Sequence, residues 1–245
     1  MSNIALIFAG GSGKRMNTVS KPKQFLELRG KPIIIYTLEL FDNHPMIDGI
    51  VISCIEEWIP YLERLIKKFC ISKVKTIVSG GDTGQDSIYN GLEATKELFT
   101  TNCNVLIHDG VRPLIGEKTI TDNVEGVLNY GSCITCIPAT ETFIVCNSEG
   151  LIDIPSRTDS LIARAPQSFV LQDILSAHRR AQSEGRHDFI DSCSMMNHYG
   201  YKLHTIVGPV ENIKITTPTD FFIFRALVDV CENKQISVSY THLRA

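Results

Sequence analysis

A short apolar segment that runs directly into a glycine-rich loop is the strongest constraint in this 245-residue sequence. Residues 4–9 are all apolar, and three of the four residues 10–13 are glycine. Such a run predicts a buried strand, and glycines at its carboxyl end let backbone N–H groups approach an anion closely. Arg15, Lys21 and Lys23 add positive charge directly after the loop. The segment therefore predicts a polyphosphate-binding loop.

Two common phosphate-binding loops do not fit this sequence. The Walker loop requires Ser or Thr directly after its Gly-Lys pair, and here Arg15 follows Lys14. The dinucleotide-binding fingerprint requires a third glycine at the position that Met16 occupies. The alternative to a phosphate site is a plain turn between strand and helix, in which glycine is needed only because it adopts backbone dihedral angles that other residues rarely adopt.

The composition indicates a globular protein that binds neither nucleic acid nor a membrane. Hydrophobic residues make up 43% and charged residues 21%, and the formal net charge of −3 disfavours a nucleic-acid partner. The sequence has no run of 18 apolar residues and no signal-peptide pattern, which predicts a cytoplasmic protein. The eight cysteines are scattered, and we interpret them, including the pair at 133 and 136, as reduced core residues.

Apolar segments alternate with amphipathic segments along most of the chain. This alternation predicts a Rossmann-like three-layer α/β/α fold, in which helices cover both faces of a mostly parallel sheet. The expected strands are 4–9, 49–54, 74–79, 104–108, 132–138 and 202–207. The expected helices are 33–43, 57–69, 86–99, 117–129, 171–183 and 218–231. Ligands bind beyond the carboxyl ends of such strands, so the loops at 10–13, 80–81 and 108–110 are expected to line one cleft.

A β-hairpin is expected where this alternation breaks. Two apolar segments, 141–146 and 151–154, flank a turn at residues 147–150. Because little else covers it, we expect a projecting arm, about residues 139–157, that packs against a second subunit in a homodimer.

One domain accounts for most of the chain. Residues 1–233 are expected to form a single domain that carries the arm, because this length suits one α/β domain. Residues 234–245 show no core face, and we expect a tail that is disordered or extraneous to the folded unit.

Two charged residues are candidates for a binding site. Asp109 ends an apolar strand on the side of the glycine-rich loop, where a carboxylate suits Mg²⁺; capping of the turn before Pro113 is the alternative. Lys214 lies in a short predicted strand between Ile213 and Ile215. A lysine there requires either an anionic partner or a path to solvent on an edge strand.

Two further segments carry weaker signals. The residues 80–82, followed by Ser87, predict a loop that frames a nucleobase, although a helix N-cap is the commoner role of Ser87 or Asp86. Arg157 and Arg164 lie beside the base of the hairpin. They are interpreted either as a bidentate clamp for a second phosphate or as ordinary surface charges.

Taken in order, these segments resemble the CTP-dependent cytidylyltransferases of sugar-alcohol phosphates, over about residues 4–230. One branch of that family acts on 2-C-methyl-D-erythritol 4-phosphate in isoprenoid synthesis, and another acts on ribitol 5-phosphate for wall polymers (teichoic acid) and capsules. The motifs that carry the resemblance are Ala9–Met16, Pro22–Leu26, Gly80–Gly81 with Ser87, His108–Asp109 with Arg112–Pro113, Pro166–Gln167 and Asn212–Thr216. Each motif is short, but the ordered set is specific.

The resemblance implies a role for each matching residue. Arg15, Lys23 and Lys214 are expected to act on the reacting phosphates. The residues expected to bind CTP are Ala9, Gly10, Gly11, Ser12, Gly13, Gly81, Asp82, Ser87, Asp109 and Gly110. Asp109 is also expected to hold Mg²⁺. The residues expected to contact the alditol phosphate are Thr142, Arg157 and Ala165, with Arg157 acting from the partner subunit.

The implied reaction transfers CMP from CTP to a sugar-alcohol phosphate and releases pyrophosphate. Both reactants are anions, so catalysis is expected to come from positioning and from cations, without a covalent intermediate. Val111 and the segments 154–157 and 191–193 favour ribitol 5-phosphate as the acceptor, with 2-C-methyl-D-erythritol 4-phosphate a close second.

The chain departs from the family pattern at three positions. Gly84 stands where Arg is usual, and Ala165 and Ile190 stand where Thr is usual. These departures leave two rival functions open. One is a sugar-1-phosphate nucleotidyltransferase that uses another nucleoside triphosphate, and the other is a nucleotide-binding relative without catalysis.

Overall fold

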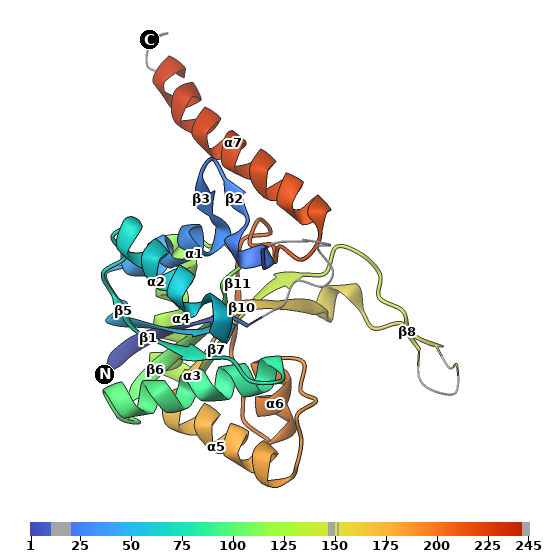
Figure 1. The fold of residues 1–245 in the computed structure, drawn as a ribbon. Helices are drawn as coiled ribbons and strands as arrows, with labels where there is room; N and C mark the ends of the chain where they lie inside the picture. The colour runs from blue at the N-terminus through green and yellow to red at the C-terminus, as the bar shows by residue number, and fades with distance from the viewer. Residues whose placement is uncertain (11–20, 147–149, 151, 242–245) are drawn as a thin grey trace.

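A seven-stranded sheet lies at the centre of the computed structural model, which describes residues 1–10, 21–146, 150 and 152–241. Within these residues the strand order is β11-β7-β10-β6-β1-β4-β5 (Figure 1). The strands are β1 (Ser2–Ala9), β4 (Gly49–Cys54), β5 (Val74–Ser79), β6 (Cys103–Asp109), β7 (Ser132–Pro138), β10 (Leu161–Val170) and β11 (Thr205–Val207). Neighbouring strands are parallel except at β10, which is antiparallel to both β6 and β7. The predicted mostly parallel architecture is confirmed.

Helices cover both faces of this sheet, as predicted. They are α1 (Ile33–Asp42), α2 (Ile59–Lys68), α3 (Gly84–Phe99), α4 (Glu117–Tyr130), α5 (Leu171–Ser183) and α6 (Ser192–His198). Side chains alternate along β1, so Ala5 and Ile7 pack with residues of α1, α2 and α4, and Ile4 and Leu6 pack with residues of α3, α5 and α6. The apolar run of the first strand is therefore buried on both sides, which is why it contains no polar alternation.

Strand β10 and helix α6 are the longest elements of the body that were absent from the sequence-based expectation. Strand β10 was not predicted, because Arg164 and Pro166 interrupt its apolar pattern and Pro lacks the N–H that a ladder needs. The structure accommodates both residues where the pairing of β10 with β7 shifts register between Ala163 and Gln167. Helix α6 has only seven residues, which is too short for a clear helical period.

Helix α7 (Pro218–Thr241) runs away from the sheet and passes the small hairpin of β2 (Glu27–Leu28) and β3 (Lys31–Pro32) (Figure 1). Phe224 anchors its first half: it is fully buried, and its ring meets that of Tyr36 edge-on at 5.4 Å. The helix extends past residue 231, where we expected it to end. The assignment of residues 234–245 to a tail stays a prediction. Among the described residues, no helix combines the length and the apolar character that crossing a membrane requires.

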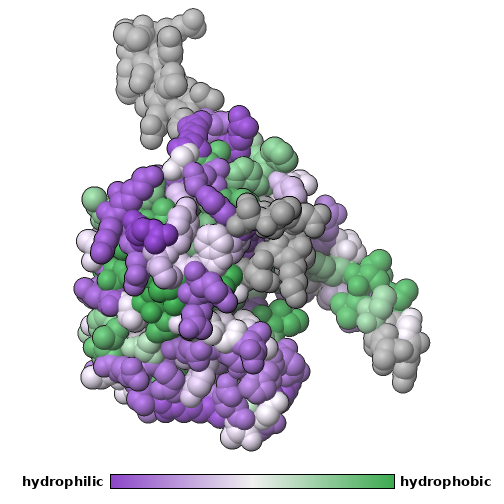
Figure 2. Space-filling view, viewed as in Figure 1, coloured by the Kyte–Doolittle hydropathy of each residue, from purple (hydrophilic) through white to green (hydrophobic). Residues whose placement is uncertain are grey.

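The predicted hairpin is present as an antiparallel pair, β8 (Val145–Cys146) and β9 (Ile152–Asp153), which projects from the body (Figure 1). Gly150, with a φ of +77°, lies in the connection, where a left-handed backbone favours glycine. A short 3₁₀ helix, η4 (Arg157–Asp159), leads from the arm into β10. Hydrophobic residues colour much of the arm in Figure 2, away from any other part of the body. The exposed apolar side chains of the arm are Phe143, Ile144, Val145, Ile152 and Ile154.

Candidate active site

A cavity of about 200 Å³ lies at the carboxyl ends of β1 and β6, next to the middle of β10. Its charged lining includes Asp109, Arg112, Arg164 and Lys214. Its apolar lining includes Phe8, Ile88, Ile107, Phe189 and Met195. This is the edge of a parallel sheet at which ligands bind, and it is the edge predicted from the sequence.

The three loops expected at this edge lie next to one another in the parts that the structure describes, but of their described residues only His108 and Asp109 line the cavity. A Cβ on Gly10 would lie 3.1 Å from the Ser87 hydroxyl oxygen, so the loops after β1 and β5 touch. The N–H of Gly110 donates to the carbonyl of Phe8 over 2.9 Å, which joins the loop after β6 to the end of β1. Gly11, Ser12, Gly13 and Arg15 lie outside the described residues, so their predicted phosphate contacts stay predictions.

Asp109 is held between two cations. Lys214 Nζ lies 2.6 Å from one carboxylate oxygen, and Arg112 Nε donates to the other over 2.7 Å. Burial alone would raise the pKa of Asp109, but the charges of Lys214 and Arg112 outweigh it and hold that pKa well below its usual range. Asp109 is therefore a carboxylate at neutral pH, and it fixes the position of the Lys214 ammonium.

The anionic partner predicted for Lys214 is thus found, and it is Asp109. The alternative of a lysine on an edge strand is wrong, although 39% of the Lys214 side chain is exposed and it keeps a path to solvent. The predicted strand around Lys214 is also wrong: residues 212–216 form no ladder, and the N–H of Ile215 donates to the carbonyl of Val111 instead. Ile215 is fully buried beneath this contact, which orients the segment toward the cavity.

Asn212 connects the lysine segment to β10. Its carbonyl accepts a hydrogen bond from Arg112 Nη1 over 2.8 Å, and its side-chain amide donates to the carbonyl of Ala165 over 2.6 Å. Ala165 lines the cavity, as its predicted acceptor role requires. From the sequence, Arg112 and Asn212 were recognised only as members of the family motifs, without a structural role of their own. Their bridging role depends on a contact between residues 100 positions apart, which no local pattern reveals.

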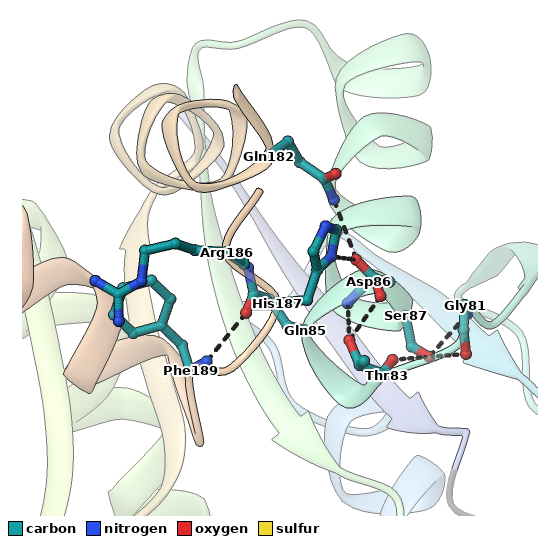
Figure 3. Close-up of polar contacts among 9 residues, drawn as sticks. All are labelled: Gly81, Thr83, Gln85, Asp86, Ser87, Gln182, Arg186, His187 and Phe189. Carbon is teal, nitrogen blue, oxygen red and sulfur yellow. Dashed lines mark hydrogen bonds and ion pairs between the residues drawn. The ribbon is translucent and has the colours of Figure 1, made fainter. Parts of the chain in front are cut away.

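The loop before α3 is rigidly organised around a helix cap (Figure 3). The cap is Thr83, whose hydroxyl accepts from the N–H of Asp86 and donates to the Asp86 carboxylate, so neither Ser87 nor Asp86 is the N-cap. Ser87 instead accepts from the N–H of Gly81 over 2.9 Å and donates to the carbonyl of Thr83 over 2.8 Å. A Cβ on Gly81 would lie 2.5 Å from that of Asp86, so the loop requires glycine there. Asp82 is exposed beside it.

The segment between α5 and α6 lines the cavity and is bonded to the start of α3, as Figure 3 shows for the bonds. Gln85 holds it through two bonds: its amide donates to the carbonyl of Arg186, and its oxygen accepts from the N–H of Phe189. His187 adds a 2.8 Å contact to the Asp86 carboxylate. Sequence reasoning missed these residues. The only local sign was the position of Gln85 at the start of a predicted helix. That position does not identify a hydrogen-bond partner about 100 residues away.

Lys23 lies on the 3₁₀ helix η2 (Lys23–Phe25), which is tied to the end of β1. The amide of its neighbour Gln24 donates to the carbonyl of Ala9 over 2.7 Å. This bond holds the short helix of Lys23 next to Ala9, and the expected contact of Lys23 with phosphates stays a prediction. Lys21 pairs with Glu27 at 3.2 Å on the surface instead.

Two residues that were predicted to contact the acceptor do not line the cavity of their own chain. Thr142 and Arg157 are exposed on the arm and do not line the cavity. This agrees with the expected approach of Arg157 from a partner subunit, but it does not test it.

The donor set suits a magnesium ion that is shared with phosphates. Among the described residues, no group of three or more His, Cys, Asp or Glu side chains is arranged to hold a metal. Asp191 also lines the cavity, but its oxygens accept bonds from Gln167 and from the N-terminus of α6. Asp109 is left as the carboxylate of the site. A carboxylate has about four lone-pair positions, and two cations use two of them, so one Mg²⁺ contact fits if phosphate oxygens and water complete the shell.

Comparison with known proteins matches this chain over nearly its whole length. A family model described as IspD, 2-C-methyl-D-erythritol 4-phosphate cytidylyltransferase, matches residues 3–229. A ribitol-5-phosphate cytidylyltransferase of Vibrio parahaemolyticus is 53% identical over 235 residues, which cover 96% of this chain and 99% of that protein. A 2-C-methyl-D-erythritol 4-phosphate cytidylyltransferase of Clostridium botulinum is 37% identical, covering 93% of this chain and 97% of that protein.

Solved structures agree with the fold. The crystal structure of a 4-diphosphocytidyl-2C-methyl-D-erythritol synthase from Anaerococcus prevotii superposes with a TM-score of 0.81 at 23% identity. The match covers 93% of this chain and 96% of that one.

Proposed function

Because the chain belongs to the 2-C-methyl-D-erythritol 4-phosphate cytidylyltransferase (IspD) family, we propose that it transfers CMP from CTP to ribitol 5-phosphate. The products are CDP-ribitol and pyrophosphate. The chain is a nucleotidyltransferase of the cytidylyl type by family membership. The observation that carries the acceptor assignment is the 53% identity to a ribitol-5-phosphate cytidylyltransferase over almost the full length of both chains. We place the reaction in the cytoplasm.

The proposed chemical step needs no covalent enzyme intermediate. A phosphate oxygen of the acceptor forms a bond to the α-phosphorus of CTP, and the bond from that phosphorus to the oxygen bridging to the β-phosphate breaks. The electron pair leaves with pyrophosphate. Because both reactants are anions, the main task of the protein is to bring them together and to neutralise the charge around the α-phosphorus.

Lys214 is proposed to perform that task at the α-phosphate. An ammonium has three N–H donors, and one of them points to Asp109 over 2.6 Å. The other two are available for phosphate oxygens while Asp109 keeps the side chain in place. Arg15 and Lys23 are proposed to bind the β- and γ-phosphates together with the backbone of residues 10–13.

Mg²⁺ is proposed to bind through Asp109 and the phosphates of the nucleotide. A bound Mg²⁺ would supply charge neutralisation and orientation of the triphosphate. The role of this chain is to present one ionised carboxylate, which the low pKa of Asp109 ensures.

Cytosine is proposed to lie against the loop of Gly81, Asp82 and Ser87, with Ala9 and Gly110 nearby. The hydrogen bonds of the Ser87 hydroxyl go to the loop itself, to the backbone of Gly81 and of Thr83. We therefore infer that Ser87 shapes the loop and that backbone groups, rather than this hydroxyl, read the base.

The acceptor is proposed to contact Ala165 from one subunit and Thr142 and Arg157 from another. The support for a homodimer is the exposed apolar arm, on which Ile144 is 62% and Ile152 is 65% exposed. A side chain of this size is stabilised by about 2 kcal/mol on full burial, so covering several of them favours association.

A panel of acceptors and nucleotides tests the proposal. Pyrophosphate release is measured with CTP and either ribitol 5-phosphate, 2-C-methyl-D-erythritol 4-phosphate or other polyol phosphates, and then with UTP, GTP or ATP in place of CTP. We expect the highest kcat/KM with CTP and ribitol 5-phosphate. A preference for 2-C-methyl-D-erythritol 4-phosphate would reassign the acceptor, and binding of CTP without turnover on any acceptor would contradict the enzyme assignment.

A further inference from the structure

Arg164 is a cation in the cavity without an anionic partner. It lies on β10 between Ala163 and Gln167, where the strand leaves its register with β7, and its side chain is half-buried and lines the cavity. Its Nε is buried and has no hydrogen-bond partner. Its Nη1 reaches the carbonyl of Asn212 only at 3.4 Å, and that oxygen already accepts from Arg112 at 2.8 Å.

The charges around Arg164 favour an anion. The cavity is lined by three cations, Arg112, Arg164 and Lys214, and by two carboxylates, Asp109 and Asp191. Asp109 is paired with Arg112 and Lys214, whereas Asp191 accepts from the N–H of Ser194 at the start of α6 and from Gln167. Among the described residues, Arg164 takes part in no ion pair.

Among the described Arg, Lys, Asp and Glu side chains of the lining, cations therefore outnumber carboxylates by one, and Arg164 is the cation that lacks a carboxylate. A half-buried guanidinium with an unsatisfied N–H is unfavourable until an oxygen anion accepts from it.

We propose that Arg164 binds the phosphate group of the acceptor and thereby determines selectivity for a phosphorylated polyol. This inference rests on the proposed function and adds a specificity-determining residue to it. A phosphate monoester matches the guanidinium in charge, and its several oxygens can accept from Nε and from a terminal nitrogen together. The acceptor phosphate must also lie near Lys214, because it attacks the phosphorus that Lys214 neutralises, and both side chains line the same cavity.

Kinetics of Arg164→Gln and Arg164→Lys test the role. Loss of a hydrogen bond to a charged group is expected to raise the KM for ribitol 5-phosphate roughly 10- to 100-fold in Arg164→Gln and to leave the KM for CTP unchanged. Arg164→Lys keeps the charge but loses the planar pair of donors, so it should recover part of the loss. The matched control is Arg180→Gln, which removes an arginine that is paired with Glu184 on the exposed face of α5. An unchanged acceptor KM in Arg164→Gln would overturn the proposal, as would an equal rise in the KM for CTP.

A binding experiment separates the phosphate from the polyol and needs no turnover. The Tm of the protein is measured with ribitol 5-phosphate or with ribitol, in the presence of a CTP analogue that has a methylene group between its α- and β-phosphates. We expect ribitol 5-phosphate to raise the Tm of the wild type, and ribitol to raise it less. In Arg164→Gln the two ligands should become equal. If Arg164→Gln instead lost stabilisation by ribitol itself, the side chain would bind hydroxyl groups, and the phosphate assignment would be wrong. Wild-type protein that binds but does not turn over ribitol 5-phosphate would contradict the proposed function and leave the role of Arg164 standing.

Discussion

The cavity and the arm are built in opposite ways. In the cavity, charged side chains from two distant segments bind one another, because Lys214 and Arg112 both pair with Asp109; the Asn212 amide connects them to a third segment, β10. In the arm, strands of two residues each carry apolar side chains that face solvent. The cavity is organised by one chain, whereas the apolar surface of the arm is left uncovered by it.

The CTP-binding half and the acceptor-binding half of the proposed site therefore depend on different parts of the assembly. The residues proposed to contact CTP all belong to the body, so these contacts are proposed to depend on no second subunit. The acceptor contacts of Thr142 and Arg157 depend on where the arm lies, because neither residue lines the cavity of its own chain. Substitutions in the cavity should therefore act at every protein concentration, and substitutions in the arm should act through association.

The largest effect is expected from Lys214→Ala. Removing a cation that is held at the reacting phosphate should lower kcat about 10²- to 10³-fold, at all protein concentrations. Pyrophosphate release measures the loss, and circular dichroism checks the fold. Lys118→Ala is the matched control, since Lys118 pairs with Asp122 on the exposed surface of α4. Retention of full activity in Lys214→Ala would remove this residue from the catalytic set.

A smaller effect, which depends on concentration, is expected from Ile144→Ser in the arm. If a second subunit covers this side chain, the substitution should weaken dimerisation by about 2 kcal/mol, or roughly 30-fold in Kd. Sedimentation equilibrium over a range of concentrations measures it. Leu128→Ser on α4 is the control, because Leu128 is comparably exposed outside the arm. Identical dimer Kd values for wild type and Ile144→Ser would show that the arm is not the interface.

The substitution Thr83→Ala tests whether the N-cap of α3 holds the Gly81 loop in place for nucleotide binding. Loss of the N-cap of α3 should lower the free energy of unfolding by about 1 kcal/mol, measured by urea denaturation. It should also raise the KM for CTP, because the cap holds the Gly81 loop. Ser176→Ala is a suitable comparison. The Ser176 hydroxyl lies on the exposed face of α5 and donates to the carbonyl of Gln172 in the same helix. An unchanged KM for CTP would show that the Gly81 loop does not contribute to nucleotide binding.

The smallest effect is expected from His178→Leu, and it is a change in pH dependence. The pKa of His178 is lowered to about 4 by burial, whereas the unfolded chain has the ordinary value near 6.5. The unfolded state therefore binds a proton first as the pH falls, so the wild type should lose slightly less than about 1 kcal/mol of stability between pH 8 and pH 6 through this group. His178→Leu should lack that part of the loss. Parallel stability–pH curves for the two proteins would show that His178 is not held neutral in the fold.

Most of the fold could be predicted from the sequence, because the inner strands β1, β4, β6 and β7 are buried on both faces and consist largely of apolar residues. The hairpin was predictable for a similar reason, since a turn signal separates two short apolar segments. Strand β10 was not, because Arg164 and Pro166 stand where the ladder breaks, and its pairing partners β6 and β7 lie far away in sequence.

The candidate site was predictable in its parts but not in its connections. The position of Asp109 follows from the rule that ligands bind at strand ends, and the need of Lys214 for an anion follows from its apolar neighbours. The identity of that anion, and the bridge through Asn212, depend on tertiary contacts over about 100 residues. The cap of α3 was placed on the wrong residue because Thr83, Asp86 and Ser87 all have side chains suited to capping.

The break in the β10 ladder has a consequence for how this family diverges. Residues 164–166 lie between two stretches of β10 that stay paired with the sheet, at Leu161–Ala163 and at Gln167–Phe169. Residues 164–166 pair with neither β6 nor β7, so even a substitution that changes the backbone there, such as one to or from proline, removes no ladder hydrogen bond. A new contact to the acceptor can thus arise on β10 while the paired parts of the strand stay as they are.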